Sequence, residues 1–193
     1  MTDGRFRPPV RVVVMAIVAG AASFLAPQSS ATQAQREKSG RIQQIDKAAG
    51  ARLLRKIGQR RRKTWHWQEV MGRPHTTHSR HPAPSLAYRR WVLRLWTQRE
   101  LHARRQAHHP PHLTAWLCIH RYEGSWTDPD PPYFGGLQMD LGFQRTYAPE
   151  LVRRKGTADK WSPLEQIWVA ERAYQSGRGF YPWPNTARYC GLL

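Results

Sequence analysis

Acidic residues, cysteines and long hydrophobic runs are all scarce in this chain of 193 residues. It has 13 Asp and Glu against 31 Lys and Arg, which gives a formal net charge of +18 at pH 7. The imbalance is local, because residues 32–110 hold nineteen basic and four acidic side chains, whereas residues 111–193 hold nine and eight. We therefore expect separate roles for the basic region and the almost neutral one, in localisation and in chemistry.

No apolar run reaches the roughly 20 residues that a membrane-spanning helix needs. The longest covers residues 12–25, follows three arginines, and precedes small residues at 29–31 or 32–34 that suit a cleavage site. This pattern predicts a secretory signal peptide over residues 1–31. An uncleaved N-terminal anchor is the alternative. In both cases we expect the protein to be secreted or associated with the cell wall.

Two cysteines, Cys118 and Cys190, are the complete set. In an exported protein, a single pair that brackets a domain predicts a disulfide rather than a metal site or a redox pair. In the chain-entropy model, a bridge across a loop of this length stabilises a small domain by about 4 kcal/mol. A nucleophilic cysteine is the alternative, although no paired histidine stands in a recognisable signature.

The C-terminal region contains the most informative pattern in the chain. Residues 113–122 are mostly apolar and helix-compatible, Glu123 follows them, and Gly124 provides the stop that a helix needs. A proline-rich loop at residues 128–132 cannot continue the helix. Residues 133–139 then predict a short strand pair whose two glycines let a ligand approach the backbone. This order places Glu123 at the mouth of a cleft.

Four stretches carry a family pattern: residues 116–126 with the Glu and a Gly-Ser-Trp turn, 133–138 with Tyr-Phe-Gly-Gly-Leu-Gln, 162–172 with a helix, and 179–190 with Trp-Pro and a Cys. Together they resemble the lysozyme-like domain of the resuscitation-promoting factors and related transglycosylase-like cell-wall proteins. The resemblance implies an α+β fold, namely a small, mainly helical lysozyme-like domain over residues 112–193 with one β-hairpin, preceded by a basic helical region.

The position of the first cysteine departs from the family. There it directly precedes the catalytic glutamate, whereas Tyr122 has that place in this chain and Cys118 lies one helical turn earlier. Residues four positions apart on a helix share a face, so a bridge from Cys118 to Cys190 is compatible with the shift.

The resemblance implies a glycosidase that cleaves the β-1,4 bonds of peptidoglycan, with Glu123 as its general acid. A carboxylic acid delivers a proton near neutral pH when apolar surroundings raise its pKa. The nearby residues suited to form such surroundings are Trp116, Leu117, Trp126 and Tyr133. A non-catalytic peptidoglycan-binding or structural wall module is the alternative function.

The number of carboxylates separates two reactions. A hydrolase of the muramidase type needs a second acid. Among Asp128, Asp130 and Asp140, the last follows the hairpin and is the one expected to face Glu123. The resemblance implies a different route, in which a lytic transglycosylase uses one Glu as acid and then as base while the muramyl group closes an anhydro ring. In that case Asp140 is dispensable.

Four side chains are candidates for binding the glycan. Gln138 and Tyr133 offer hydrogen bonds to acetamido and hydroxyl groups, and Trp126 and Trp183 offer flat faces to sugar rings. Packing inside the domain is the alternative for each of them. No cofactor is expected.

The basic region divides into a partly disordered segment, residues 32–63, and a helical region with a linker, residues 64–111. Within the first segment, apolar residues at helical spacing favour a short basic amphipathic helix. In the linker His75, His78 and His81 recur every third residue. Neither a carboxylate nor a thiol stands beside them, so we expect solvent-exposed histidines there and no metal site.

Anionic wall polymers or a membrane surface are the partners expected for residues 32–110, besides the peptidoglycan glycan strands themselves. A merely solvated basic face is the alternative. Nucleic acid is a weaker candidate, because an exported protein is separated from the nucleic acid of the cell. In addition, 25 of the 31 basic residues are Arg, a bias that GC-rich coding alone would produce. An apolar stripe over residues 88–96 predicts a helix that packs against protein.

Overall fold

The computed structural model describes residues 30–77 and 85–193. The predicted signal peptide lies outside these residues except for its last two positions. The chain divides into two compact units, residues 1–42 and residues 43–193. The described part of the first unit is an exposed stretch of helix, and the second unit holds the other described elements.

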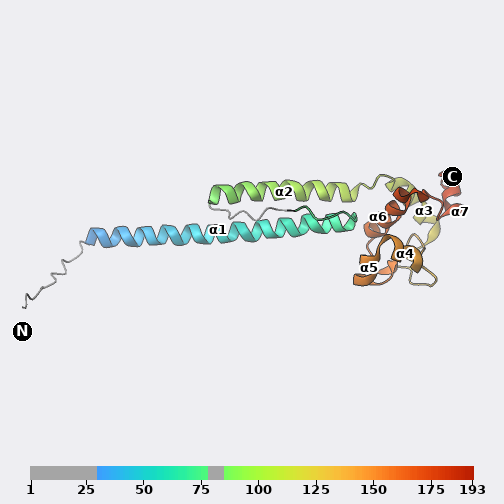
Figure 1. Ribbon diagram of the computed structural model, residues 1–193, viewed down its shortest axis with the longest axis horizontal. Helices are drawn as coiled ribbons and strands as arrows, with labels where there is room; N and C mark the ends of the chain where they lie inside the picture. The colour runs from blue at the N-terminus through green and yellow to red at the C-terminus, as the bar shows by residue number, and fades with distance from the viewer. Residues whose placement is uncertain (1–29, 78–84) are drawn as a thin grey trace, which may run out of the picture. The chain divides into compact units, whose positions relative to one another are not determined.

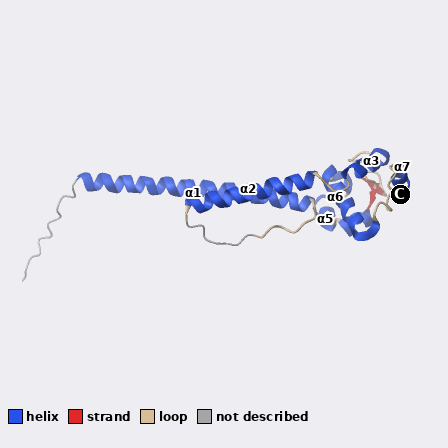
Figure 2. Cartoon of the chain, turned by 90° about the horizontal axis from the view of Figure 1, so that it is seen from above, coloured by secondary structure: helices blue, strands red, loops and turns tan. Residues whose placement is uncertain are grey.

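The described part of the chain is mainly helical with one small antiparallel sheet, so the fold is α+β (Figure 1). Its elements in chain order are α1 Ser30–Val70, α2 Leu86–His108, α3 Leu113–Glu123, β1 Tyr133–Phe134, β2 Met139–Asp140, α4 Leu141–Tyr147, α5 Pro149–Lys155, a 3-10 turn Ala158–Lys160, α6 Pro163–Ala173, a π turn Tyr174–Arg178 and α7 Pro184–Tyr189. Strands β1 and β2 form the predicted hairpin (Figure 2).

Helix α1 runs without a break through the boundary that the sequence suggested at residue 63. It has 41 residues, contains no proline, and is rich in the good helix formers Ala, Gln, Arg and Lys. The segment that we expected to be partly disordered, residues 32–63, is therefore helical in this structure. Gly72, with a φ of 68°, follows the end of the helix. None of the described helices is both long and apolar enough to cross a membrane.

Helices α1 and α2 lie side by side (Figure 1, Figure 2). Arg60 of α1 pairs with the buried Glu100 of α2 at 2.6 Å, and the ring of Trp65 meets the ring of Trp96 edge-on. Trp96 is buried as its place in the predicted stripe requires, but Trp91 from the same stripe is 49% exposed. The apolar stripe of α2 is therefore covered over only part of its length.

A small apolar cluster connects these two helices to the C-terminal domain. Trp168 of α6 packs with Val70, Met71, Ala103 and Ala107. Its indole Nε1 donates a hydrogen bond to the carbonyl oxygen of Ala107 at 2.8 Å. The hydrogen bond sets the orientation of the buried indole, in addition to the apolar packing of its ring.

The main core is formed by α3, the hairpin, α4, α5, α6 and α7. It includes the fully buried Trp116, Ile119, Val169 and Ala187. Helix α6 begins with a capping box at Ser162, as the Ser-Pro-Leu-Glu sequence indicates. These helices bring the end of α3 close to the start of α7.

Glu171 is fully buried in this core. Its carboxylate accepts hydrogen bonds from the backbone N–H of His112 at 2.8 Å and from Nε1 of Trp116 at 2.9 Å, and Nδ1 of His112 lies 3.2 Å away. A buried carboxylate with several donors satisfies its lone pairs. Glu171 thereby anchors the start of α3 to α6.

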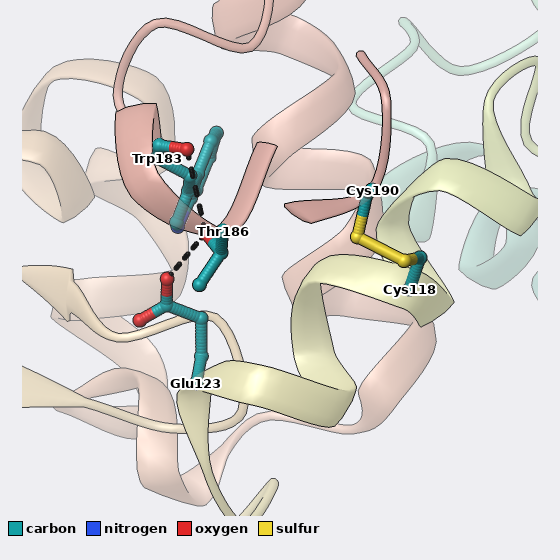
Figure 3. Close-up of a disulfide and its surroundings, with 5 residues drawn as sticks. All are labelled: Cys118, Glu123, Trp183, Thr186 and Cys190. Carbon is teal, nitrogen blue, oxygen red and sulfur yellow. Dashed lines mark hydrogen bonds between the residues drawn. A yellow bond between two sulfur atoms is a disulfide. The ribbon is translucent and has the colours of Figure 1, made fainter. Parts of the chain in front are cut away.

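The Cys118–Cys190 disulfide joins α3 to the end of α7, with a Cα–Cα distance of 6.0 Å and a sequence separation of 72 residues (Figure 3). The predicted pairing is therefore confirmed. The described residues contain no free cysteine. The bridge keeps the helix that ends in Glu123 beside the last helix of the chain.

Candidate active site

Glu123 is the last residue of α3, and its side chain is half-buried. Gly124 follows with a φ of 152°, a backbone conformation that favours glycine, and its N–H bonds the carbonyl oxygen of His120. The helix therefore ends where the sequence predicted, and the carboxylate of Glu123 points away from it toward α7 (Figure 3).

Thr186 of α7 holds this carboxylate. Its Oγ1 donates a hydrogen bond to Oε1 of Glu123 at 2.7 Å and lies 3.3 Å from the carbonyl oxygen of Trp183 (Figure 3). Thr186 is only 9% exposed, so water competes little for the bond. The disulfide joins the same two helices nearby, which limits how far Thr186 can move from Glu123.

Gln166 of α6 fixes the hairpin opposite. It is fully buried, and its Oε1 accepts a hydrogen bond from the N–H of Gly136 at 2.8 Å. Its Nε2 donates to the carbonyl oxygens of Trp126, Ala158 and Trp161. One amide thus ties the hairpin to the loop that follows Glu123.

Glycine is required at the tip of this hairpin. A Cβ at Gly135, where φ is 71°, would lie 2.5 Å from Oε1 of Gln166. A Cβ at Gly136 would lie 2.6 Å from the ring of Trp126. The glycine pair therefore serves close packing of the hairpin against Gln166 and Trp126.

His120, one turn before Glu123, supports the same hairpin from α3. Its Nδ1 lies 3.0 Å from the carbonyl oxygen of Gly136, which can only accept, so Nδ1 carries the proton of this bond. Its ring stacks on Trp126 with centroids 3.8 Å apart. One face of the Trp126 indole is therefore already covered by protein.

Gln138 has the single positive φ among the described non-glycine residues, 45°. Its Nε2 donates to Oδ2 of Asp128 at 2.7 Å and to the carbonyl oxygen of Gly135 at 3.1 Å. A Cβ at Gly124 would lie 3.3 Å from both of these side chains. Asp128 and Gln138 thus meet beside the residue that follows Glu123, and strained backbone of this kind clusters at functional sites.

Asp140 has a different role from the one the sequence suggested. It is exposed, pairs across the sheet with Tyr133, and caps α4 by accepting a hydrogen bond from the N–H of Phe143 at 2.7 Å. Asp128, rather than Asp140, has its carboxylate beside Gly124 at the end of α3. Asp128 belongs to the proline-rich loop, and the sequence does not reveal its bond to Gln138.

Trp183 lies in the core, 5% exposed, and its Nε1 donates to the carbonyl oxygen of Leu137 at 2.6 Å. Trp183 therefore packs inside the domain, which was the alternative to glycan binding, because a buried indole presents no flat face to a sugar. Tyr133 is 49% exposed on β1 and can reach a ligand. Of the expected apolar surroundings of Glu123, Trp116 is fully buried and Leu117 is 46% exposed.

Sequence reasoning missed Thr186, Gln166 and His120. Thr186 is 63 residues from Glu123 in the chain, and Gln166 is 30 residues from Gly136. A threonine after Trp-Pro and a glutamine inside an apolar helix carry no local sign of these bonds. His120 had a weak signal, since it precedes Glu123 by three residues and so lies near it on the helix surface.

No metal centre is found in residues 30–77 and 85–193, where His, Cys, Asp and Glu form no group suited to hold an ion. His75 bonds Oε1 of Glu69 at 2.9 Å and stacks on Trp65. His78 and His81 lie outside the described residues. Comparison with protein-family models, curated proteins and solved structures finds no significant match for this chain.

Proposed function

We propose that residues 112–193 form a lysozyme-like domain that cleaves the β-1,4 glycosidic bonds of peptidoglycan, with Glu123 as general acid. The observation that supports this most is the pairing of Glu123 with Thr186. A half-buried carboxylate, held at 2.7 Å by a buried hydroxyl beside a glycine hairpin, is an oriented acid and not a solvated surface group.

We infer a lytic transglycosylase rather than a muramidase. Asp140 caps α4 and Asp128 is bonded to Gln138, and no hydrogen bond among the described residues joins either side chain to Glu123. In the reaction, Glu123 gives its proton to the leaving oxygen as the glycosidic bond breaks. It then takes the proton of the muramyl hydroxyl, whose oxygen bonds the anomeric carbon and closes the anhydro ring.

Each neighbour of Glu123 has a role in this reaction. Thr186 donates to Oε1 and leaves Oε2 of Glu123 to carry the transferable proton. Tyr133 is exposed at the hairpin, and Gln138 presents its amide beside the end of α3, where an acetamido group of the glycan can bond. Trp126 offers the sugar at most the face that His120 leaves uncovered.

The basic helices support an extracytoplasmic location for this enzyme. Lys56, Arg60 and Lys63 line a groove of about 540 Å³ between α1 and α2. Clustered cations of this kind attract anionic wall polymers or a membrane surface. We therefore propose that residues 32–110 keep the secreted domain near its glycan substrate.

The decisive test is a muropeptide digest with the Glu123→Gln variant. Gln keeps the shape of the side chain but has no transferable proton, so cleavage should fall by at least about a hundredfold. Anhydro-ended products from the wild type identify a transglycosylase, whereas reducing ends identify a hydrolase. Glu37→Gln, which makes the same change on exposed α1, is the matched control and should leave the digest unchanged.

Two further variants sharpen the same digest. Thr186→Val removes the hydroxyl at constant volume and should lower kcat by about tenfold or more with little change in KM, because it removes a hydrogen bond to the carboxyl group that becomes charged as its proton leaves. Thr146→Val, which removes an exposed hydroxyl on α4, is the control and should leave kcat unchanged. Wild-type cleavage by Glu123→Gln would reject Glu123 as the general acid. No cleavage by the wild type would leave a glycan-binding module as the function.

A further inference from the structure

A cavity of about 400 Å³ lies where the end of α1 meets the α4–α5 junction and α6. Its lining includes Arg73, Arg154 and Arg172, with Glu69 and Glu150 as its acidic members. None of its lining residues belongs to the Glu123 site. The cavity is large enough for a small ligand.

Arg172 is the unusual member of this lining. Its Nε donates to the carbonyl oxygen of Tyr147 at 2.7 Å, but its terminal Nη1 is buried without a hydrogen-bond partner. Within residues 30–77 and 85–193 it forms no ion pair. Burial lowers the pKa of this guanidinium to about 10, still well above neutral pH. A charged group out of water ordinarily has a counter-ion.

The two carboxylates of the cavity already have partners. Glu69 accepts from His75 at 2.9 Å and from Arg154 at 3.1 Å. Glu150 pairs with Arg153 on the same helix. The carboxylates of the lining are thus engaged. Arg73 donates to the neutral amide oxygen of Gln106 at 3.0 Å, so Arg172 and Arg73 are the two cations of the lining without a carboxylate partner among the described residues, and Arg172 is the one with a buried, unpartnered N–H.

The absence of a side chain at Gly72 makes room for the guanidinium of Arg172. A Cβ at Gly72, where φ is 68°, would lie 2.5 Å from Nη1 of Arg172. Gly72 therefore lets the guanidinium pass beneath the turn after α1 and reach the cavity. Any other residue there would displace it or strain the turn.

We propose that this cavity binds the terminal carboxylate of a short, otherwise uncharged peptide, with Arg172 as its anchor. Three arginines against two glutamates leave the lining with a net charge of only +1, so a highly charged polyanion is repelled by Glu69 and Glu150. Pro74, Pro149 and Leu151 add apolar surface for small side chains. Arginine binds carboxylates better than any other side chain because its fork matches their geometry.

The inference deepens the proposed function and rests on it for the source of the ligand. Peptide stems of peptidoglycan end in free carboxylates, so a second site for them would hold the wall while Glu123 cleaves its glycan. The physical claim about Arg172 and a carboxylate can be tested without any cleavage.

The test is a fluorescence-anisotropy titration of the full chain with dye-labelled D-alanyl-D-alanine, as the free acid and as its C-terminal amide. The acid should bind at least about tenfold more tightly, as expected for one charge-assisted hydrogen bond. This comparison uses the wild-type protein, so it remains decisive even where a variant fails to fold. Equal binding of acid and amide, or no binding of either, would overturn the proposal.

Variants then assign the site. Arg172→Gln should weaken binding of the free-acid peptide by about tenfold and leave binding of the amide unchanged. Arg145→Gln, which removes an exposed charge on α4 outside the cavity, should change the affinity for neither peptide. Inorganic phosphate at equal ionic strength should displace the peptide no better than chloride does. Displacement by phosphate would make this a general anion site and would reject the peptide. Glu123→Gln should bind the peptide as tightly as the wild type does. Peptide binding at the cavity can therefore be judged independently of whether the protein cleaves glycan.

Discussion

Helices α1 and α2 meet through ion pairs and aromatic contacts in which one partner is often partly exposed, whereas the hairpin and the start of α3 are held by buried polar side chains with several hydrogen bonds each. In the first region, Arg60 reaches Glu100 from a side chain that is 41% exposed. In the second, Gln166 and Glu171 are fully buried and make several bonds each. Precise geometry is thus concentrated where we propose the chemistry.

The difference matches the two roles that we propose for the chain. Binding to a charged surface needs many cations and tolerates small movements, since exposed charges act through several ångströms of water. Proton transfer needs a carboxylate held within a fraction of an ångström of its working place. The predictions below test this contrast, from the largest expected effect to the smallest.

Removal of the disulfide should separate the two regions most strongly. Cys118→Ser with Cys190→Ser should destabilise the domain by about 2 to 5 kcal/mol, as loss of a native bridge does in small exported domains. Hydrogen exchange read by mass spectrometry should then show lost protection in α3 and α7 and little change in α1. Equal loss in α1 would mean that the two regions unfold as one.

Gln166→Met should be the most damaging single change in the hairpin support. It leaves the N–H of Gly136, two buried carbonyls and one partly buried carbonyl without this partner and should cost about 3 kcal/mol in the free energy of unfolding. Gln144→Met is the matched control, because the equally buried Gln144 makes one such bond, to Met139, and should cost about 1 kcal/mol. Urea denaturation measures both, and equal costs would contradict the tie between hairpin and loop.

Acid should weaken the domain through Glu165. Burial opposes its charged form, but hydrogen bonds from Lys155 and Ser162 outweigh this, so the pKa of the carboxyl lies below its ordinary value of 4.5. A lowered pKa gives stability that is present above the unfolded-state value and is lost as the pH falls through the folded-state pKa.

The Glu165→Gln variant isolates this contribution. It should be less stable than the wild type by about 2 kcal/mol at pH 7, and the gap should shrink as the pH falls below 4.5. Glu150→Gln, whose ion pair with Arg153 is exposed, is the control and should change stability little at any pH. A pH-independent gap for Glu165→Gln would show that its charge is not the cause.

Salt should affect the basic region and spare the domain. Sedimentation of the full chain with purified cell walls should decline steeply as screening shortens from about 30 Å at 0.01 M to about 10 Å at 0.1 M salt. Thermal stability of the domain should hardly move over the same range. Salt-insensitive sedimentation would reject electrostatic attachment and leave aromatic contacts to the glycan as the means of binding.

The sequence by itself determined the local features of this protein. The end of α3 at Glu123, the capping box of α6 and the glycine hairpin all follow from neighbouring residues, because caps and turns are decided within a few positions. The disulfide followed from counting, since only two cysteines exist. The segment boundary that we placed at residue 63 marks a change in composition, and α1 continues through it to Val70.

Only the tertiary structure decided which side chains meet. Thr186 reaches Glu123 from 63 residues away, and Trp183 turns its indole into the core to bond Leu137, 46 residues away. Asp128 rather than Asp140 lies beside the end of α3, and Arg172 passes beneath Gly72. Such contacts depend on how helices pack and on which buried polar groups need partners, and no short stretch of sequence encodes either.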